Sequence, residues 1–203
     1  KERKDRKYNA RAYEQFPPRF WMSWLDDKKA HLFVMDAAPG AKAKDILAGT
    51  KLAEMPGFGG SNGDEGQNLE AEWTPDGSGV VFAAATNRHE AARADVATHL
   101  FEVALAGGEP RQLTADAGNY GQLDFVADGR VLLATFTANN DEVYNNSRLV
   151  RFDWPARGGR QVLTAALDRS VSRYAVPAGA DRVYFTFEHA GLERLHSVPL
   201  AGG

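Results

Sequence analysis

The chain has 203 residues, 43% of them hydrophobic, which is enough to bury a sizeable core in one large or two small domains. A formal net charge of −3 gives no basic face for nucleic acid, and no apolar stretch approaches the ~18 residues of a membrane span. The absence of cysteine excludes disulfides and thiolate metal sites. We therefore expect neither nucleic acid nor a membrane as a partner. The chain has no initiator Met and ends on PLAGG, so both ends are interpreted as cuts from a longer protein.

The N-terminal segment has two parts. The charged run KERKDRK (1–7) is interrupted by acidic residues and is expected to form a solvated arm or helix. An aromatic cluster follows and is expected to lie in the core rather than to bind a ligand; it consists of Phe16, Phe20, Trp21 and Trp24.

The segment GGSNG (59–63) matches the G-x-S-x-G pattern in which serine hydrolases carry their nucleophile. That chemistry needs a strand before the serine, a helix after it, and a histidine and a carboxylate within reach. Pro56 and Gly57 precede the motif, and a polar stretch broken by Gly66 follows it, so the sequence predicts a loop. Ser61 is therefore not expected to be a nucleophile.

A short strand-like segment recurs four times along the chain, each time with a leucine at its second position and a glycine turn behind it. The copies are spaced about 50 to 70 residues apart, and the loop that contains Ser61 explains the longest spacing as an insertion. They are HLFVMD (31–36), HLFEVA (99–104), RLVRFD (148–153) and RLHSVP (194–199).

A second block, a predicted hairpin, interleaves with the first; its copies are EWTPDGSGVVFAA (72–84), DFVADGRVLLATF (124–136) and YAVPAGADRVYFTF (174–187). Asp-Gly between apolar strands favours a tight hairpin turn, because glycine tolerates positive φ. Together the two blocks predict about four short antiparallel strands in about 50 residues, which is typical of a β-propeller blade. The predicted fold is all-β: a partial β-propeller of about four blades, formed as a single domain by residues 1–203. A β-sandwich is the competing architecture.

The block WTPDGSGVVF, followed by HLFEVALAGGEPRQLT, resembles the WD40-like repeat of TolB-type propellers. Three further segments are similar to the propeller of prolyl-oligopeptidase-family serine peptidases, in the bacterial dipeptidyl-peptidase and acylaminoacyl-peptidase branch: residues 10–34, 141–153 and 167–198. This resemblance implies a non-catalytic segment that covers the active site of an α/β-hydrolase domain and shapes the pocket for a peptide N-terminus. The partners it implies are a peptide substrate and the hydrolase domain, which this chain does not carry.

Two other functions are kept as alternatives. A stand-alone TolB-like propeller would act as a protein- or ligand-binding scaffold, and the blades alone do not separate it from the peptidase propeller. An independent hydrolase built on Ser61 is the least favoured alternative. The resemblance also implies a bacterial protein of the periplasm or the cytoplasm, with the periplasm favoured.

Substrate-contacting residues of a propeller are expected on long loops at one rim, because a rigid scaffold positions them there. Two loops qualify, TNRHEAARADVAT (86–98) and TANNDEVYNNS (137–147). A carboxylate would bind the α-ammonium group of a peptide, and an arginine would orient a peptide carbonyl. The candidate substrate-binding residues are Glu142 or Asp141, with Glu90 behind them, and Arg88; exposed loop charges without a role are the competing interpretation.

No metal or cofactor is expected. The five histidines lack the i, i+4 spacing of a zinc-binding helix. The acidic residues Asp64, Glu65, Glu70 and Glu72 lack the ligand spacing of a calcium loop and are interpreted as a solvated loop. Because an open arc of blades leaves strand edges and two faces uncovered, the chain is expected to self-associate.

Overall fold

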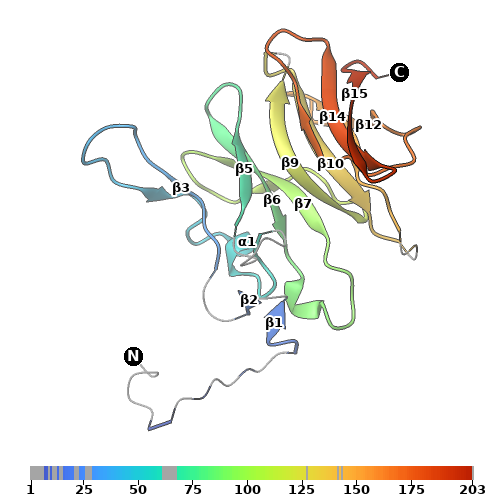
Figure 1. Cartoon of the computed structure of the whole chain (residues 1–203). Coiled ribbons are helices and arrows are strands. Elements are labelled where there is room, and N and C mark those ends of the chain that lie inside the picture. Colours follow the sequence, from blue (N-terminus) through green and yellow to red (C-terminus); the bar gives the residue numbers. More distant parts are fainter. Residues whose placement is uncertain are drawn as a thin grey trace.

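The computed structural model describes residues 7–8, 10, 13, 16–20, 23–25, 29–60, 68–126, 128–140, 142 and 144–202. These residues form mainly antiparallel strands, as Figure 1 shows. Within these ranges, no helix is long and apolar enough to span a membrane.

Two successive four-stranded meanders form the centre of the molecule. The first, here called blade A, consists of β5 (Glu70–Trp73), β6 (Gly79–Ala85), β7 (Thr98–Ala104) and β8 (Arg111–Gln112). The second, blade B, consists of β9 (Gly118–Val126), β10 (Val131–Ala138), β11 (Arg148–Asp153) and β12 (Gly158–Val162). In both blades each strand pairs antiparallel with the next, as the turns between them require.

A third sheet, blade C, follows with β13 (Arg173–Ala175), β14 (Arg182–His189) and β15 (Leu192–Pro199). The N-terminal part is less regular and contains two separate hairpins and a short helix. The hairpins are β1 (Arg19–Phe20) with β2 (Ser23–Trp24), and β3 (Phe33–Val34) with β4 (Lys44–Asp45); the helix is α1 (Lys51–Glu54).

The four copies of the first repeat coincide with β3, β7, β11 and β15, and the second repeat forms the hairpins β5–β6, β9–β10 and β13–β14. Figure 1 shows blades A, B and C following one another across the molecule, coloured from green to red. The prediction of an all-β, partial β-propeller is confirmed.

The hairpin turns have the backbone conformations that the repeats predict. Gly77, Gly129 and Gly179 have φ values of 66°, 79° and 73° and occupy the same turn position, where a side chain would be strained. Gly129 also lies against the neighbouring blade, because a Cβ built there would be 2.3 Å from the Cβ of Pro75. The turns of blades A and B therefore pack directly on each other.

The turn of blade A is held by the carboxylate of Asp76. It accepts hydrogen bonds from the backbone N–H of Ser78 (3.1 Å) and from the hydroxyl groups of Thr74 (2.7 Å) and Ser78 (2.8 Å). Hydrogen bonds to the charged form stabilise it, and they lower the pKa of Asp76 to about 2.

The core is arranged in layers between successive sheets. Val80 and Phe82 of β6 pack toward the N-terminal part of the chain, whereas Val81 and Ala83 pack toward blade B. Side chains alternate between the two faces of a strand, so the continuous apolar run GVVFAAA corresponds to a strand covered on both sides. Blade B is covered in the same way, by blade A on one face and by blade C on the other.

The segment between β4 and β5 packs against blade A. Thr50 caps α1 by accepting a hydrogen bond from the N–H of Ala53, and the carboxylate of Glu109 accepts from the first two N–H groups of the helix. Phe58 is fully buried in the same layer as Phe82. Ser61, together with Asp64 and Glu65, lies outside the described residues, as do Trp21 and almost all of the expected N-terminal arm.

Candidate functional site

The loops singled out by the sequence lie at the same end of their blades. In blade A, residues 86–97 connect β6 to β7 and contain a short 3₁₀ helix, η1 (Arg88–Glu90). In blade B, residues 139–147 connect β10 to β11. In an antiparallel meander the connection from the second to the third strand lies at the end where the first strand enters. Figure 1 shows each of the two loops at the lower end of its own blade.

A cleft of about 250 Å³ opens at this end, between blades A and B, and Phe20 and Gly60 of the N-terminal part also line it. Ala91, Asp95 and Val96 of the first loop form one side of it. Asn119 at the start of β9 and Asn139 after β10 contribute polar side chains from blade B. The two loops therefore do meet at one site, through their bases.

Side-chain amides connect the two blades at the cleft. Asn119 accepts a hydrogen bond from the N–H of Thr98 (3.0 Å) through its Oδ1 and donates from Nδ2 to Oδ1 of Asn139 (3.2 Å). The N–H of Asn139 in turn donates to the carbonyl of Ala117 (3.1 Å). Thr98 and Asn119 also form the parallel bridge between β7 and β9. These bonds fix the cleft wall to both blades, so the site is largely preformed.

The loop that carries Asp95 is held by its own hydrogen bonds. Asn87 Nδ2 donates to the carbonyl of Asp95 (2.9 Å), and the N–H groups of Arg93 and Ala94 donate to the carbonyl of Glu90. Asp95 is exposed, and no described residue donates a hydrogen bond to its carboxylate or forms an ion pair with it. Of the described residues that line the cleft, Asp95 alone carries a negative charge, and it stands beside two amide side chains. This set of groups suits a cationic or N–H donor ligand.

Arg88 has a different position from the one expected of a substrate-contacting loop residue. It is buried, and its guanidinium donates to the carbonyl of Phe58 (2.6 Å) and, through Nε, to that of Gly57 (3.3 Å). A Cβ on Gly59 would lie 1.9 Å from this guanidinium, so the arginine fills space that a glycine leaves. Burial lowers the pKa of Arg88. This arginine fastens the segment 57–60 beneath the loop, and it is not at the surface to orient a peptide.

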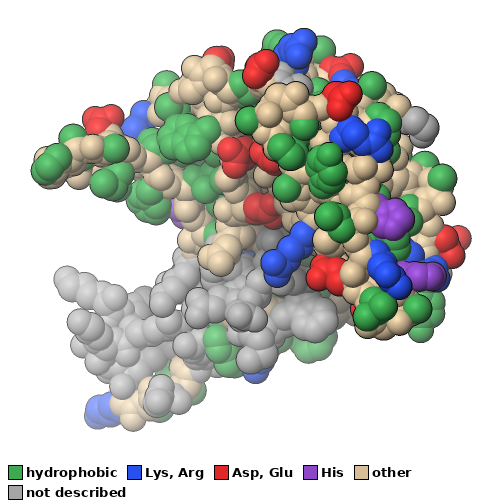
Figure 2. Space-filling view, turned by 45° about the horizontal axis from the view of Figure 1, so that its top comes forward, with side chains coloured by type: hydrophobic (Ala, Val, Ile, Leu, Met, Phe, Trp, Pro, Cys, Tyr) green, Lys and Arg blue, Asp and Glu red, His purple; other side chains and the backbone are tan. Residues whose placement is uncertain are grey.

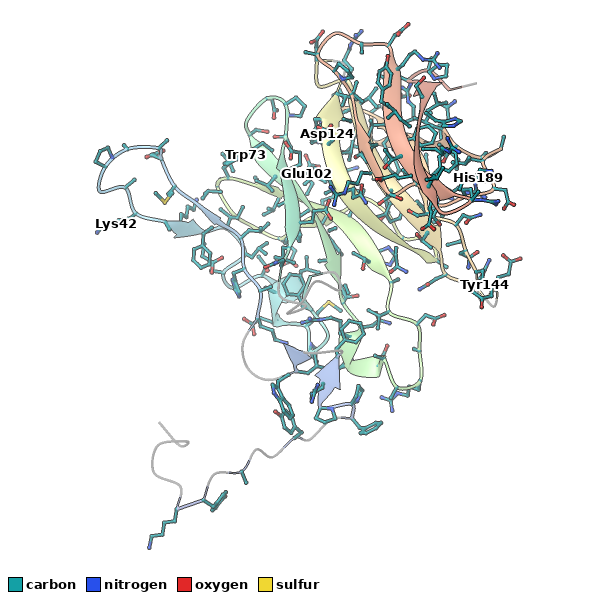
Figure 3. All side chains as sticks on the ribbon, viewed as in Figure 1. Lys42, Trp73, Glu102, Asp124, Tyr144 and His189 are labelled. Carbon is teal, nitrogen blue, oxygen red and sulfur yellow. The ribbon has the colours of Figure 1, made fainter. Side chains whose placement is uncertain are left out.

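Glu90 and Glu142 are not part of the cleft lining. Glu90 lies on η1 with its carboxylate 3.9 Å from Nε2 of His89. Glu142 is exposed, and its N–H donates to Oδ1 of Asn140 (2.9 Å), which also accepts from Nδ2 of Asn145 (2.7 Å). The side chain of Tyr144 in this loop is almost fully exposed, and Figure 3 shows its place below blade B. Asp141 lies outside the described residues.

A second cluster of polar side chains lies on the first strand of each blade, that is on β5, β9 and β13. Glu70 accepts a hydrogen bond from the N–H of Leu123 on β9 (2.7 Å), and Tyr174 of β13 donates to the carbonyl of Gln122. Burial raises the pKa of Glu72, with repulsion from Asp124 as the second cause, and burial also raises the pKa of Asp124. The pKa of Tyr174 is raised by burial and by the same acidic residues. Acidic side chains gather near the centre of the face drawn in Figure 2.

This inner group corrects the interpretation of Glu70 and Glu72 as part of a solvated loop, because both residues lie on β5 and pack toward β9. A signal for it was present in the repeats: Glu72, Asp124 and Tyr174 hold the same position in the three hairpin copies. Equivalent positions of neighbouring blades face one another in a propeller. Among the residues that the structure describes, no three histidine or acidic side chains are placed to hold a metal ion. Nothing in the sequence distinguished Asp95 from other loop acids.

No family model matches the chain, and no curated protein is significantly similar to it. Among solved structures, a protein assigned as TolB from Agrobacterium tumefaciens aligns with a TM-score of 0.54 and 14% identity, over 87% of this chain and 54% of the other. TolB from Acinetobacter baumannii aligns with a TM-score of 0.40 and 18% identity, over 86% of this chain and 41% of the other. The chain thus spans about half the length of these TolB structures. The first alignment supports a TolB-like β-propeller fold, and neither bears on the narrower resemblance to peptidase propellers.

Proposed function

We propose that this chain is a TolB-like propeller segment that binds a protein or peptide partner and performs no chemistry of its own. The observation that carries the proposal is the cleft between blades A and B, where the Asp95 carboxylate and the amides of Asn119 and Asn139 converge. The chemical class of the bound group is a cation with N–H donors, such as a peptide α-ammonium group or a lysine side chain.

The rigidity of the site supports a binding role. Its wall is tied to two blades through Asn119, so a ligand would meet groups that are already positioned. Preorganised groups lose little conformational entropy when a ligand binds. Placing a polar site on a rim held by stacked sheets is also the usual way in which a rigid scaffold presents a binding surface.

A narrower function is the second proposal: a propeller that receives the N-terminus of a peptide substrate for an attached hydrolase domain. The observation that favours it is the exposed loop tip with Glu142 and Tyr144, which directly follows the cleft residue Asn139 in the chain. In this proposal the bound cation is specifically the peptide α-ammonium group, and Glu142 contributes to its recognition. A periplasmic location belongs to the same narrower proposal.

The test is an NMR titration of the ¹⁵N-labelled chain with three small probes. Trialanine amide carries an α-ammonium group, its N-acetylated form carries none, and N-acetyl-lysine amide carries only a side-chain ammonium group. We expect both ammonium probes to shift the amide signals of Asp95, Thr98 and Asn119, and the acetylated trialanine to leave them unchanged. Absence of shifts with both ammonium probes would refute the proposed site.

Two variants separate the proposals. Asp95→Asn should weaken binding of both ammonium probes about fivefold, the loss of an ion pair worth about 1 kcal/mol. Glu142→Gln is the matched control and should bind as the wild type does. If Glu142→Gln weakens binding of trialanine amide and Asp95→Asn does not, the peptidase-type arrangement replaces the cleft proposal.

A further inference from the structure

The two asparagines of the cleft between blades A and B have a fixed arrangement of donors and acceptors. The backbone N–H of Thr98 donates to the side-chain amide of Asn119 (3.0 Å), and only the oxygen of an amide accepts. The Nδ2 group of Asn119 is thereby turned toward Asn139 and donates to it (3.2 Å), so the contacted atom of Asn139 is also an oxygen. One backbone N–H group therefore sets the orientation of both amides.

This orientation leaves the Nδ2 group of Asn139 as a hydrogen-bond donor at the cleft. Asn139 is half-buried and belongs to the cleft lining. Among the residues that the structure describes, none accepts a hydrogen bond from its Nδ2, which carries two N–H groups. The cleft thus combines an acceptor, the Asp95 carboxylate, with a donor of the opposite polarity on blade B.

The rest of the lining restricts what the cleft can hold. Among its described residues none is Lys, Arg or His, so a ligand carboxylate would meet Asp95 without a cationic partner. Phe20, Ala85 and Val96 contribute apolar surface. The volume of about 250 Å³ lies below the range of about 300 Å³ and more that is usual for ligand pockets. The cleft therefore suits a short end group that carries a cation and an acceptor but no negative charge.

We propose that the cleft binds the first residue of a peptide through two contacts. The α-ammonium group pairs with the Asp95 carboxylate, and the carbonyl oxygen of the same residue accepts a hydrogen bond from Nδ2 of Asn139. The inference rests on the proposed cation-binding function of the cleft and names the class of ligand.

The covalent structure of a peptide end explains this choice. Its ammonium and carbonyl groups are separated by a single Cα atom, so both enter a small cleft together. A lysine side chain brings only its ammonium group, and its carbon chain would leave the N–H groups of Asn139 without an acceptor, which weakens binding. In this arrangement Asn119 is a positioning residue, because it holds the amide of Asn139 in the orientation that donates to the ligand.

The test is an NMR titration of the ¹⁵N-labelled chain at pH 6 with two amines of similar size. Alaninamide carries an α-ammonium group and a carbonyl, whereas sec-butylamine has an ethyl group in place of the amide. Both are charged at this pH, because an α-amino group has a pKa of about 8. We expect alaninamide to bind about fivefold more tightly, the contribution of one neutral hydrogen bond. Equal affinities would overturn this inference and leave the cation-binding function standing, whereas absence of binding by both amines would overturn both.

Free alanine separates a peptide end from an amino acid. It has the same α-ammonium group, but its carboxylate would lie beside Asp95, so we expect it to bind more weakly than alaninamide. Tighter binding of alanine than of alaninamide would assign the cleft to free amino acids and overturn the proposal.

Variants of the chain test the donor. Asn139→Asp keeps an oxygen for the N–H of Asn119 and removes both N–H groups of Nδ2, so the fivefold preference for alaninamide over sec-butylamine should disappear. Asn140→Asp adds the same charge at an exposed neighbour outside the cleft lining, and this matched control should retain the preference. Asp95→Asn should weaken both amines alike. Because each result is a ratio of two affinities, a general loss of stability does not produce it. A preference that persists in Asn139→Asp would overturn the proposal.

Discussion

Replacing Glu102 with Gln is predicted to loosen the connection between blades A and B. Glu102 on β7 accepts hydrogen bonds from Nε (2.8 Å) and from a terminal nitrogen (2.6 Å) of Arg157, which belongs to the turn before β12. The two side chains are 18% and 25% exposed. The same guanidinium lies 4.4 Å from the ring centre of Trp154 and donates to the carbonyl of Pro155. Arg157 is therefore already oriented for its two bonds to the carboxylate.

The magnitude follows from this geometry. A hydrogen bond to a charged group contributes about 1.5 to 3 kcal/mol, whereas an exposed ion pair contributes about 0.2 to 1 kcal/mol. The pair is bidentate and mostly covered, so we expect Glu102→Gln to lower the free energy of unfolding by about 1.5 kcal/mol. For a chain of this length that corresponds to a decrease in Tm of about 3 to 6 °C.

The assay is urea denaturation followed by tryptophan fluorescence, on the wild type, Glu102→Gln, Arg157→Gln and the double variant. The double-mutant cycle isolates the pair, and we expect a coupling free energy of about 1.5 kcal/mol. The exposed pair Asp168–Arg169 provides the comparison, with an expected coupling below about 0.5 kcal/mol. A coupling free energy for Glu102 and Arg157 no larger than that of the exposed pair would refute the reasoning.

Three further predictions concern charge and exposed surface. Burial raises the pKa of Asp124, so ionisation of this carboxyl group lowers the stability of the fold above its ordinary pKa of about 4. In thermal unfolding, Asp124→Asn should therefore be more stable than the wild type at pH 7. The difference should disappear below about pH 4. A less stable variant at pH 7 would contradict this. The effect of Asp76 on stability has the opposite sign, because the pKa of this residue is lowered. Its ionised carboxylate stabilises the fold above about pH 4, and this contribution is lost toward pH 2. The stability of Asp76→Asn should therefore decline less steeply with acid than that of the wild type. An equally steep decline would exclude the role given to that turn. We also predict that the chain self-associates through the exposed side chains of Phe33 and Met35 in the β3 segment. Replacing both residues with Ser should reduce self-association, whereas Leu195→Ala should leave it unchanged. A wild-type chain that sediments as a monomer at high concentration would count against this prediction.

Most of the blade architecture could be predicted from the sequence because it depends on short-range rules. Alternation of side chains, Asp-Gly turns and apolar runs act within a few residues, and repetition marks the same unit several times. The hairpins of all three blades confirm this, and so does the positive φ at Gly77 and Gly129. The N-terminal hairpins were less predictable, because their strands are only two residues long and carry little periodic signal.

The candidate site could be predicted only in part. The two rim loops were identified by length and polarity, and they do meet, but the residue that enters the cleft is Asp95. Arg88 and Glu90 stand in the same loop with similar sequence signals, yet the first is buried against carbonyls of residues 57–58. Arg88 is buried there because Gly59, about thirty residues earlier in the chain, leaves room for its guanidinium. No local sequence pattern around Arg88 indicates this contact.

By itself, the sequence determined the strands, their turns and their repetition, because these arise from contacts between near neighbours in the chain. Only the tertiary structure decided which loop residues face the cleft, that Glu72 and Asp124 approach Tyr174, and that Leu195 remains exposed while its equivalents are buried. Each of these depends on how one sheet stacks on the next. Stacking brings together side chains far apart in sequence, and their burial and charge are properties of that arrangement.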